Sequence, residues 1–198
     1  KKFQKNIPGA NKDPRFWASG ISVVMHMQNP HIPAMHFNTR YICTTQNWFG
    51  GGMDVTPSIK DKKEEKNFHL SLKRMCNRHN KKYYKRYKEW CDKYFYLPHR
   101  SEARGIGGIF FDYKKNNFER DFKFVRDVGV TFQMIFNNII EKKIHKKWTL
   151  KDKEMQYIKR GRYAEFNLLY DRGTKFGLQT GGNVEGILMS LPPIAKWK

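Results

Sequence analysis

One stretch, His36 to Asp54, restricts what this chain can fold into more than any other. Its first half alternates, so an extended strand places His36, Asn38 and Arg40 side by side on one face. A proton carrier, an amide and a guanidinium are costly to bury together, so this face predicts a functional site rather than packing. The opposite face of the same strand carries Phe37, Thr39 and Tyr41.

The second half of the stretch predicts another strand with an unusual face. At the same period, Trp48, Gly50, Gly52 and Asp54 point to one side. Two of these four have no side chain, so a flat molecule would fit directly against the backbone there. Asp54 adds a carboxylate at the end of the row, so the stretch predicts a site for a flat, anionic ligand that carries N–H donors.

Length and composition indicate one globular, cytoplasmic domain. The 198 residues are 39% hydrophobic, and no apolar run approaches the length of a membrane span. Residues 1–5 lack the apolar core of a signal peptide. Cys43, Cys76 and Cys91 form no Cys-x-x-Cys pair, which argues against a disulfide framework or structural zinc; a nucleophilic cysteine stays as a minor alternative.

The charge balance allows two classes of partner. With 39 Lys+Arg against 18 Asp+Glu, the formal net charge is +21, which is typical of proteins that contact phosphates. The lysines, however, cluster in segments that read as loops and helix exteriors, whereas arginines fall in motif-like stretches. Arginine suits bidentate carboxylate binding, so a small molecule with several carboxylates is favoured over RNA. These arginines are Arg40, Arg100, Arg104, Arg160, Arg162 and Arg172.

Periodicity predicts an α+β fold dominated by antiparallel strands. The aromatics of residues 83–95 have helical spacing, which favours core packing over RNA stacking. The glycines at 105–108 precede a strand, so they do not form a dinucleotide-binding loop. Expected helices cover 62–80, 83–95, 117–144 (with Asn117 as its N-cap) and 149–159. Expected strands cover 18–27, 35–42, a third ending near Thr56, 109–112, one from Arg160, 175–180 and 184–191, with turns expected at 170–174 and 181–183.

Long, particular motifs resemble one family, the oxygen-dependent coproporphyrinogen III oxidases of haem biosynthesis, in its bacterial form. The resemblance spans residues 1–198 as a single domain, and the N-terminal part of the family domain is missing. The matching segments are ASGIS (18–22), NPHIP (29–33), HFNTRY (36–41), WFGGGMD (48–54), YFYLPHR (94–100), RGIGGIFFD (104–112) and an almost unbroken block over 160–193.

The resemblance implies an enzyme that converts two propionates of coproporphyrinogen III to vinyls and yields protoporphyrinogen IX. Molecular oxygen is the oxidant, carbon dioxide and hydrogen peroxide are released, and no organic cofactor is expected. The implied fold is a broad, mostly antiparallel β-sheet flanked by α-helices on both sides. The implied assembly is a homodimer formed through about Tyr163 to Pro193, with no nucleic-acid partner.

The same resemblance assigns roles to particular residues. His36 resembles the proton donor, and Asp54 is our candidate for accepting pyrrole N–H bonds and promoting deprotonation of the reacting ring. Arg104 is expected to clamp a second propionate. Thr39 faces away from its neighbours by alternation, so its contact is expected through the backbone. The substrate contacts are Ser22, Asn38, Thr39, Arg40, Gly181, Gly182 and Asn183.

Metal use is a separate question. His26, His36, His69 and His99 match histidines proposed as ligands in bacterial members, and Mn²⁺ is the candidate ion, although all-imidazole sites suit Zn, Cu or Fe better. The alternative is that these histidines make structural or substrate contacts; His31, in a turn, is expected to be structural.

Two other functions remain open: a truncated, non-catalytic fragment that binds tetrapyrroles or dimerises, and a basic RNA-binding module.

Overall fold

The computed structural model describes residues 7–197 and has an α+β fold, as predicted. The lysine-rich residues 1–5, on which the absence of a signal peptide was argued, lie outside the described residues. No helix within 7–197 has the length and apolar character needed to cross a membrane. The strands are β1 (Trp17–Met25), β2 (Ala34–Cys43), β3 (Asn47–Thr56), β4 (Tyr96–Leu97), β5 (Glu102–Ala103) and β6 (Gly108–Lys114). The helices are α1 (Lys62–His79), α2 (Tyr83–Tyr94), α3 (Phe118–Lys143), α4 (Leu150–Leu169), α5 (Arg172–Gln179) and α6 (Val184–Leu188), with a 3₁₀ turn at Pro98–Arg100.

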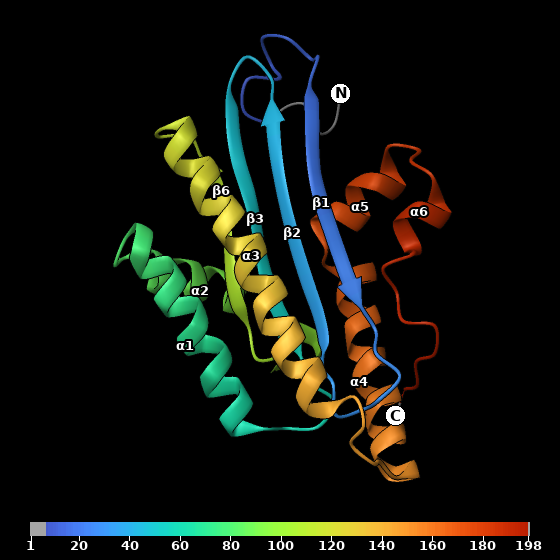
Figure 1. Ribbon diagram of the computed structural model, residues 1–198. Coiled ribbons are helices and arrows are strands. Elements are labelled where there is room, and N and C mark those ends of the chain that lie inside the picture. Colours follow the sequence, from blue (N-terminus) through green and yellow to red (C-terminus); the bar gives the residue numbers. More distant parts are fainter. Residues whose placement is uncertain (1–6, 198) are drawn as a thin grey trace.

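The main sheet has four antiparallel strands in the order β1-β2-β3-β6 (Figure 1). Asn38 lies opposite Ser22 on β1 and opposite Gly52 on β3, and His36 lies opposite Asp54. Directly opposed residues of antiparallel strands point to the same face. The register therefore confirms the predicted alternation and unites the polar residues of three strands on one surface.

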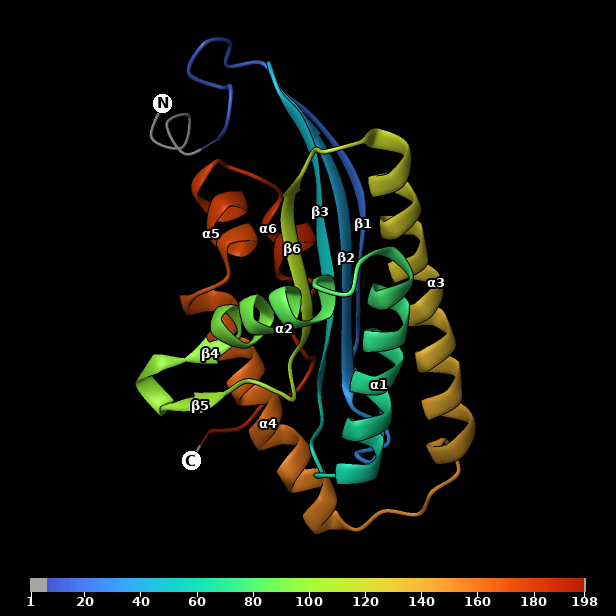
Figure 2. The same cartoon turned by 90° about the vertical axis from the view of Figure 1, so that its left-hand side faces the viewer.

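Helices cover both faces of this sheet, as the resemblance implied. Figure 2 shows α1 and α3 along one face, and α4, α5 and α6 on the opposite side. The face toward α1 and α3 is apolar: Phe37, Met53 and Phe111 are buried there with residues of both helices. Long apolar stripes on the helices bury this face, and the hydrophobic effect supplies most of the driving force for the arrangement.

Two local predictions about structural residues are confirmed. Asn117 is the N-cap of α3, because its side chain accepts a hydrogen bond from the Arg120 amide. His31 has a structural role, since its Nε2 lies 3.1 Å from the Lys147 carbonyl just beyond α3. The amide of Asn29 donates to the carbonyl of Lys143 at 3.0 Å, so the 29–33 motif closes the end of that helix.

The aromatic helix α2 packs into the protein, as predicted. Tyr87 is only 3% exposed, and its ring lies 5.6 Å from that of Phe111 and 5.7 Å from that of Phe124. A second small cluster joins Phe95, Phe110 and Phe166 beneath the helix. These rings are therefore engaged with one another rather than presented for stacking on bases.

The predicted strands from Arg160 onward are wrong, because this segment forms helices joined by turns. Helix α4 runs through Leu169, and α5 and α6 replace the two strands that were expected afterwards. Almost every residue of 160–167 is buried, so the pattern fitted a strand as well as a helix. Gly161 marks no turn: a Cβ there would collide with the carbonyl of Lys196, so it provides room for a packed chain. Asp171 and Asn183, read as turn residues, are the N-caps of α5 and α6.

Candidate active site

The polar face of β2 carries His36, Asn38 and Arg40 in a row, as the alternation predicted. The side chains of His36 and Arg40 are 27% and 26% exposed, so both are mostly buried but still reach the surface. Arg40 Nη1 donates to Asn38 Oδ1 at 2.8 Å. Phe37, on the opposite face of β2, is buried with residues of α1 and α3, so this row lies on the other side of the sheet, where Figure 2 shows α4, α5 and α6.

Asp54 is the buried centre of the site. His36 Nδ1 lies 2.9 Å from one of its oxygens, and Arg104 Nη2 forms an ion pair with the other. Asp54 is 3% exposed and Arg104 is 2% exposed. The guanidinium of Arg104 is enclosed by three aromatic rings, whose centroids lie 4.0 Å (Phe95), 4.6 Å (Tyr163) and 4.8 Å (Phe166) from its Cζ. These rings favour a cation at this position.

The electrostatics keep Asp54 ionised. Burial by itself raises its pKa, but the charge of Arg104 and the hydrogen bond from His36 outweigh burial, so the pKa is lowered overall. Burial lowers the pKa of Arg104, and the neighbouring Asp54 carboxylate more than restores it. With Asp54 ionised, His36 donates through Nδ1, and its Nε2 is the nitrogen left to act on a ligand.

Arg104 was expected to clamp a propionate. Its observed contacts are those of a residue that holds Asp54 in place, and a direct contact between Arg104 and a propionate stays a prediction. The three rings around it were missed by the sequence analysis. Two of them, Tyr163 and Phe166, lie on α4, the helix that was partly mistaken for a strand, so their approach to Arg104 was not foreseeable from that pattern.

The structure gives Gly50 and Gly52, the two glycines on the predicted ligand-facing side of β3, a role within the sheet itself. A Cβ on Gly52 would collide with the carbonyl of Ile109 on β6, so Gly52 permits close pairing of the two strands. A Cβ on Gly50 would lie 2.8 Å from Cζ of Arg40, so the space at Gly50 is taken by the Arg40 side chain. A flat ligand on this face would therefore meet Arg40 as well as bare backbone.

The remaining predicted substrate contacts lie at the margins of this face. Ser22 is exposed on β1 and opposes Asn38. Thr39 opposes Ile21 and Gly51 on the other face of the sheet, which confirms its predicted orientation. The turn of 181–183 joins α5 to α6 on the α4 side (Figure 2). Gly181 has φ +74°, a conformation that favours glycine, and its contact with a substrate stays a prediction.

The four histidines predicted as metal ligands do not converge. His26 Nε2 lies 3.0 Å from the carbonyl of Ser190, and His69 Nε2 lies 2.9 Å from the carbonyl of Ile106. His69 is on α1, which covers the face of the sheet opposite to α4 (Figure 2). Across residues 7–197, no three His, Cys, Asp or Glu side chains are grouped to hold a metal. The predicted four-histidine site does not fit this structure.

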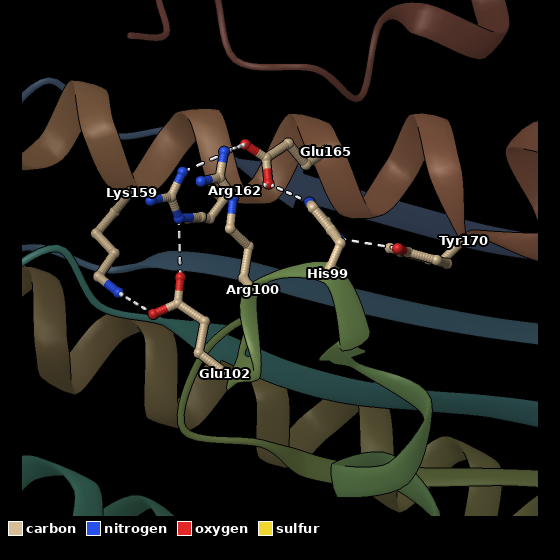
Figure 3. Close-up of polar contacts among 7 residues, drawn as sticks. All are labelled: His99, Arg100, Glu102, Lys159, Arg162, Glu165 and Tyr170. Atoms are coloured by element: carbon tan, nitrogen blue, oxygen red, sulfur yellow. Dashed lines mark hydrogen bonds and ion pairs between the residues drawn. The ribbon is translucent and has the colours of Figure 1, made fainter. Parts of the chain in front are cut away.

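Instead, His99 belongs to an ionic network centred on Glu165. His99 Nε2 lies 2.7 Å from Glu165 Oε2, and its Nδ1 lies 2.8 Å from the hydroxyl of Tyr170 (Figure 3). Arg100 Nη2 donates to Glu165 Oε1 at 2.6 Å, and Arg162 bonds to both Glu165 and Glu102. The hydrogen bonds from Arg100, with those from His99, lower the pKa of Glu165 to about 2 despite the opposing effect of burial.

This network joins the 98–103 segment to α4 (Figure 3). The segment leads directly into Arg104, and α4 provides two rings of the Arg104 enclosure. The network therefore fixes both sides of the enclosure relative to each other. Its members come from two distant segments, and the hydrogen bonds between these segments join residues 60 to 71 positions apart. The sequence offered only the arginine-rich motifs as a signal.

Comparisons with known proteins identify where these motifs recur. The family model described as coproporphyrinogen III oxidase matches residues 1–198. Curated proteins named oxygen-dependent coproporphyrinogen-III oxidase match from Rickettsia rickettsii (strain Sheila Smith), 56% identical over 98% of this chain and 70% of the relative, and from Rickettsia bellii (strain OSU 85-389), 56% identical over the whole chain and 71% of the relative. The protein of that name from Rickettsia akari (strain Hartford) is 55% identical over 98% of this chain and 70% of the relative.

Proposed function

The chain belongs to the coproporphyrinogen III oxidase family, and from its site we propose how it carries out the oxygen-dependent oxidation of coproporphyrinogen III. The observation that supports the assignment of chemistry is the His36–Asp54–Arg104 cluster, which combines an ionised, buried carboxylate with a partly exposed imidazole. The enzyme is an oxidoreductase of haem biosynthesis, and its substrate is a flexible tetrapyrrole with four propionates and four pyrrole N–H groups.

Substrate binding is assigned to the polar face of β2. Arg40 and Asn38 are partly exposed there, and a guanidinium binds a carboxylate bidentately. We assign one propionate to Arg40, with further contacts from Ser22, from the backbone of Thr39 and from the 181–183 turn. The tetrapyrrole then lies across the end of the row where His36 and Asp54 meet.

Proton handling is assigned to His36 and Asp54. The ionised Asp54 accepts a hydrogen bond from Nδ1 of His36 and holds the imidazole in one orientation, with Nε2 available for proton transfer. A carboxylate has about four lone-pair positions, so Asp54 retains capacity to accept from a pyrrole N–H and thereby to make the reacting ring electron-rich. Arg104 maintains the carboxylate in its charged form throughout.

The oxidation itself uses the substrate as the electron donor. Oxygen adds to the electron-rich pyrrole to form a pyrrole-bound peroxide, which removes the β-hydrogen of the propionate as a proton. The electron pair of that C–H bond returns to the ring as the ring–oxygen bond breaks, and the hydroperoxide that leaves takes up a proton. The carboxylate then leaves as carbon dioxide, and the electron pair of the broken C–C bond completes the vinyl group. Each turnover yields one vinyl group, one carbon dioxide and one hydrogen peroxide, and a second turnover converts the second propionate. The four candidate histidines are not placed to bind one shared ion, so we assign these steps to the side chains of the site and to the substrate.

A homodimer formed through residues 163–193 is supported by the apolar surface of this segment. Leu169, Val184 and Met189 are 48%, 50% and 77% exposed. Burial of such side chains against a second copy would stabilise the association. Sedimentation should give a dimer that Val184→Glu shifts toward monomer.

We also propose a cytoplasmic location, which is supported by the three free cysteines.

The decisive experiment mixes the protein with coproporphyrinogen III under anaerobic conditions, adds oxygen, and follows product by chromatography with and without EDTA. His36→Ala should reduce product formation at least 100-fold. His31→Ala is the matched control, since His31 Nε2 contacts the Lys147 carbonyl beyond the end of α3 and His31 has no assigned role in the site; turnover should be unchanged. Substrate binding without oxygen uptake would instead support the non-catalytic fragment, and activity lost in EDTA and restored by Mn²⁺ would contradict the metal-free mechanism.

A further inference from the structure

The side chain of Arg40 crosses an entire strand. Arg40 is on β2 and Asp112 is on β6, and β3 lies between them in the sheet. Nevertheless, Arg40 Nη2 lies 2.7 Å from Asp112 Oδ2. Because neighbouring strands are about 4.8 Å apart, the guanidinium lies flat over β3 to reach its partner.

Gly50 makes this crossing possible. It lies opposite Arg40 in the β2–β3 register, directly beneath the path of the side chain. A Cβ at this position would lie 2.6 Å from Asp112 Oδ1 and 2.8 Å from both Cζ and Nε of Arg40. No real side chain tolerates such distances, so any residue other than glycine would displace the ion pair.

The carboxylate of Asp112 is itself held in a fixed direction. Its Oδ1 accepts from Trp48 Nε1 at 3.2 Å and from the Tyr113 amide at 3.0 Å. Strand β6 contains an irregularity here, and Tyr113 adopts φ +55°, which is unusual for a residue with a side chain. The irregular strand and the indole thus aim the carboxylate at Arg40, and the Asp112 side chain is only 9% exposed.

We propose that Asp112 is a positioning residue for Arg40, which it holds extended over Gly50 to receive a substrate carboxylate. This inference rests on the proposed function, in which Arg40 binds a propionate. A guanidinium has five N–H donors, and its bonds to Asn38 and Asp112 use two of them, which leaves donors for a ligand. Asp112 would by itself repel an anionic ligand, so its presence beside the site is explained by its action through Arg40.

The effect of removing Asp112 on ligand binding should depend on whether Arg40 is present, which a double-mutant cycle measures. The probe is coproporphyrin III, the oxidised tetracarboxylate that does not turn over, titrated by fluorescence. Asp112→Ala should weaken its binding about tenfold, because Arg40 loses its fixed position. In the Arg40→Ala background the same substitution should leave binding unchanged or tighten it, since only repulsion remains to be removed.

Three further variants distinguish loss of positioning from simple misfolding. Asp112→Asn keeps the shape and an acceptor, and should weaken binding about threefold with unchanged thermal melting. Asp127→Ala is the matched control: this carboxylate pairs with His79 at 2.8 Å on helices of the other layer, and its loss should not alter affinity. Gly50→Ala should reproduce the loss seen for Asp112→Ala, because both charges remain but cannot meet.

The tetramethyl ester of coproporphyrin III separates the two levels of the proposal. If the unmodified protein binds the acid and the ester equally well, carboxylate recognition is absent and the proposed function fails. If it prefers the acid, but Asp112→Ala weakens binding equally with and without Arg40, carboxylate recognition stands and the positioning role of Asp112 is overturned. A weakening for the acid alone, abolished in the Arg40→Ala background, supports the inference.

Discussion

Two arginines on the same side of the sheet pair with aspartates in opposite environments. Arg104 and Asp54 are almost completely buried, with side-chain exposures of 1% and 4%, and aromatic rings enclose the guanidinium. Arg40 pairs with Asp112, but a quarter of the Arg40 side chain remains exposed. The first cation supports an internal anion, and the second remains available to an anion from outside.

This difference shows that residue type and neighbouring charge do not by themselves define a binding arginine. Both arginines lie in long motifs, and both were predicted to bind propionates. Their degree of desolvation separates them, because a buried charge needs its partner for stability whereas an exposed one is compensated by water. The following substitutions test the comparison, beginning with the most buried pair.

Removal of the buried cation should have the largest effect. Arg104→Ala leaves the Asp54 carboxylate uncompensated, and we expect a loss of about 3–5 kcal/mol in the free energy of unfolding, measured by urea denaturation. The double variant Arg104→Ala with Asp54→Asn should recover part of that loss, since no isolated charge remains. Equal instability of the single and double variants would contradict the role of Arg104 as the counter-ion of Asp54.

Substitution in the Glu165 network should have an intermediate effect on the free energy of unfolding. Its hydrogen bonds lower the pKa of Glu165 from 4.5 to about 2, so its contribution to stability is present above about pH 4.5 and is lost as the pH falls toward 2. Glu165→Gln should cost about 1–3 kcal/mol at pH 7. The difference in unfolding free energy between the two proteins should shrink between pH 4.5 and 2, and a difference independent of pH would exclude the ionised carboxylate as its source.

Substitution of the exposed arginine should affect binding more than folding. For Arg40→Ala we expect the free energy of unfolding to fall by about 1 kcal/mol or less, because Asp112 keeps its bonds to Trp48 and the Tyr113 amide. The KM for coproporphyrinogen III should rise about tenfold or more. A large loss of stability without an effect on KM would reverse the comparison with Arg104.

Removal of an ion pair on the surface should have the smallest effect on the free energy of unfolding. Lys196 Nζ lies 2.7 Å from Glu154, and both side chains are about half exposed. Lys196→Ala should change the free energy of unfolding by less than about 0.5 kcal/mol, because solvent screens such pairs. An effect comparable to that of Glu165→Gln would show that burial does not order the ion pairs of this protein.

The sequence was most informative where the spacing of polar and apolar residues fitted only one type of secondary structure. Alternation in residues 36–54 correctly predicted which side chains share a face, and the cap at Asn117 correctly predicted the start of α3. It failed at residues 160–167, where nearly every position is buried and the pattern does not distinguish a strand from a helix. Asp171 and Asn183 were predicted to lie in turns, but a side-chain oxygen that accepts a hydrogen bond from a nearby backbone amide stabilises a turn and a helix N-cap equally well.

What the sequence alone determined is local: the polar row on β2, the glycines opposite it, and the motifs that mark the family. The partners of the two arginines were decided by the tertiary structure, because Arg104 pairs across 50 positions of the chain and Arg40 across 72. The same is true of the histidines, which hydrogen-bond to separate carbonyls and carboxylates instead of meeting at one ion. Strand alternation follows from covalent geometry, whereas which charges meet, and how completely water is excluded from them, depends on how the sheet and α4 pack.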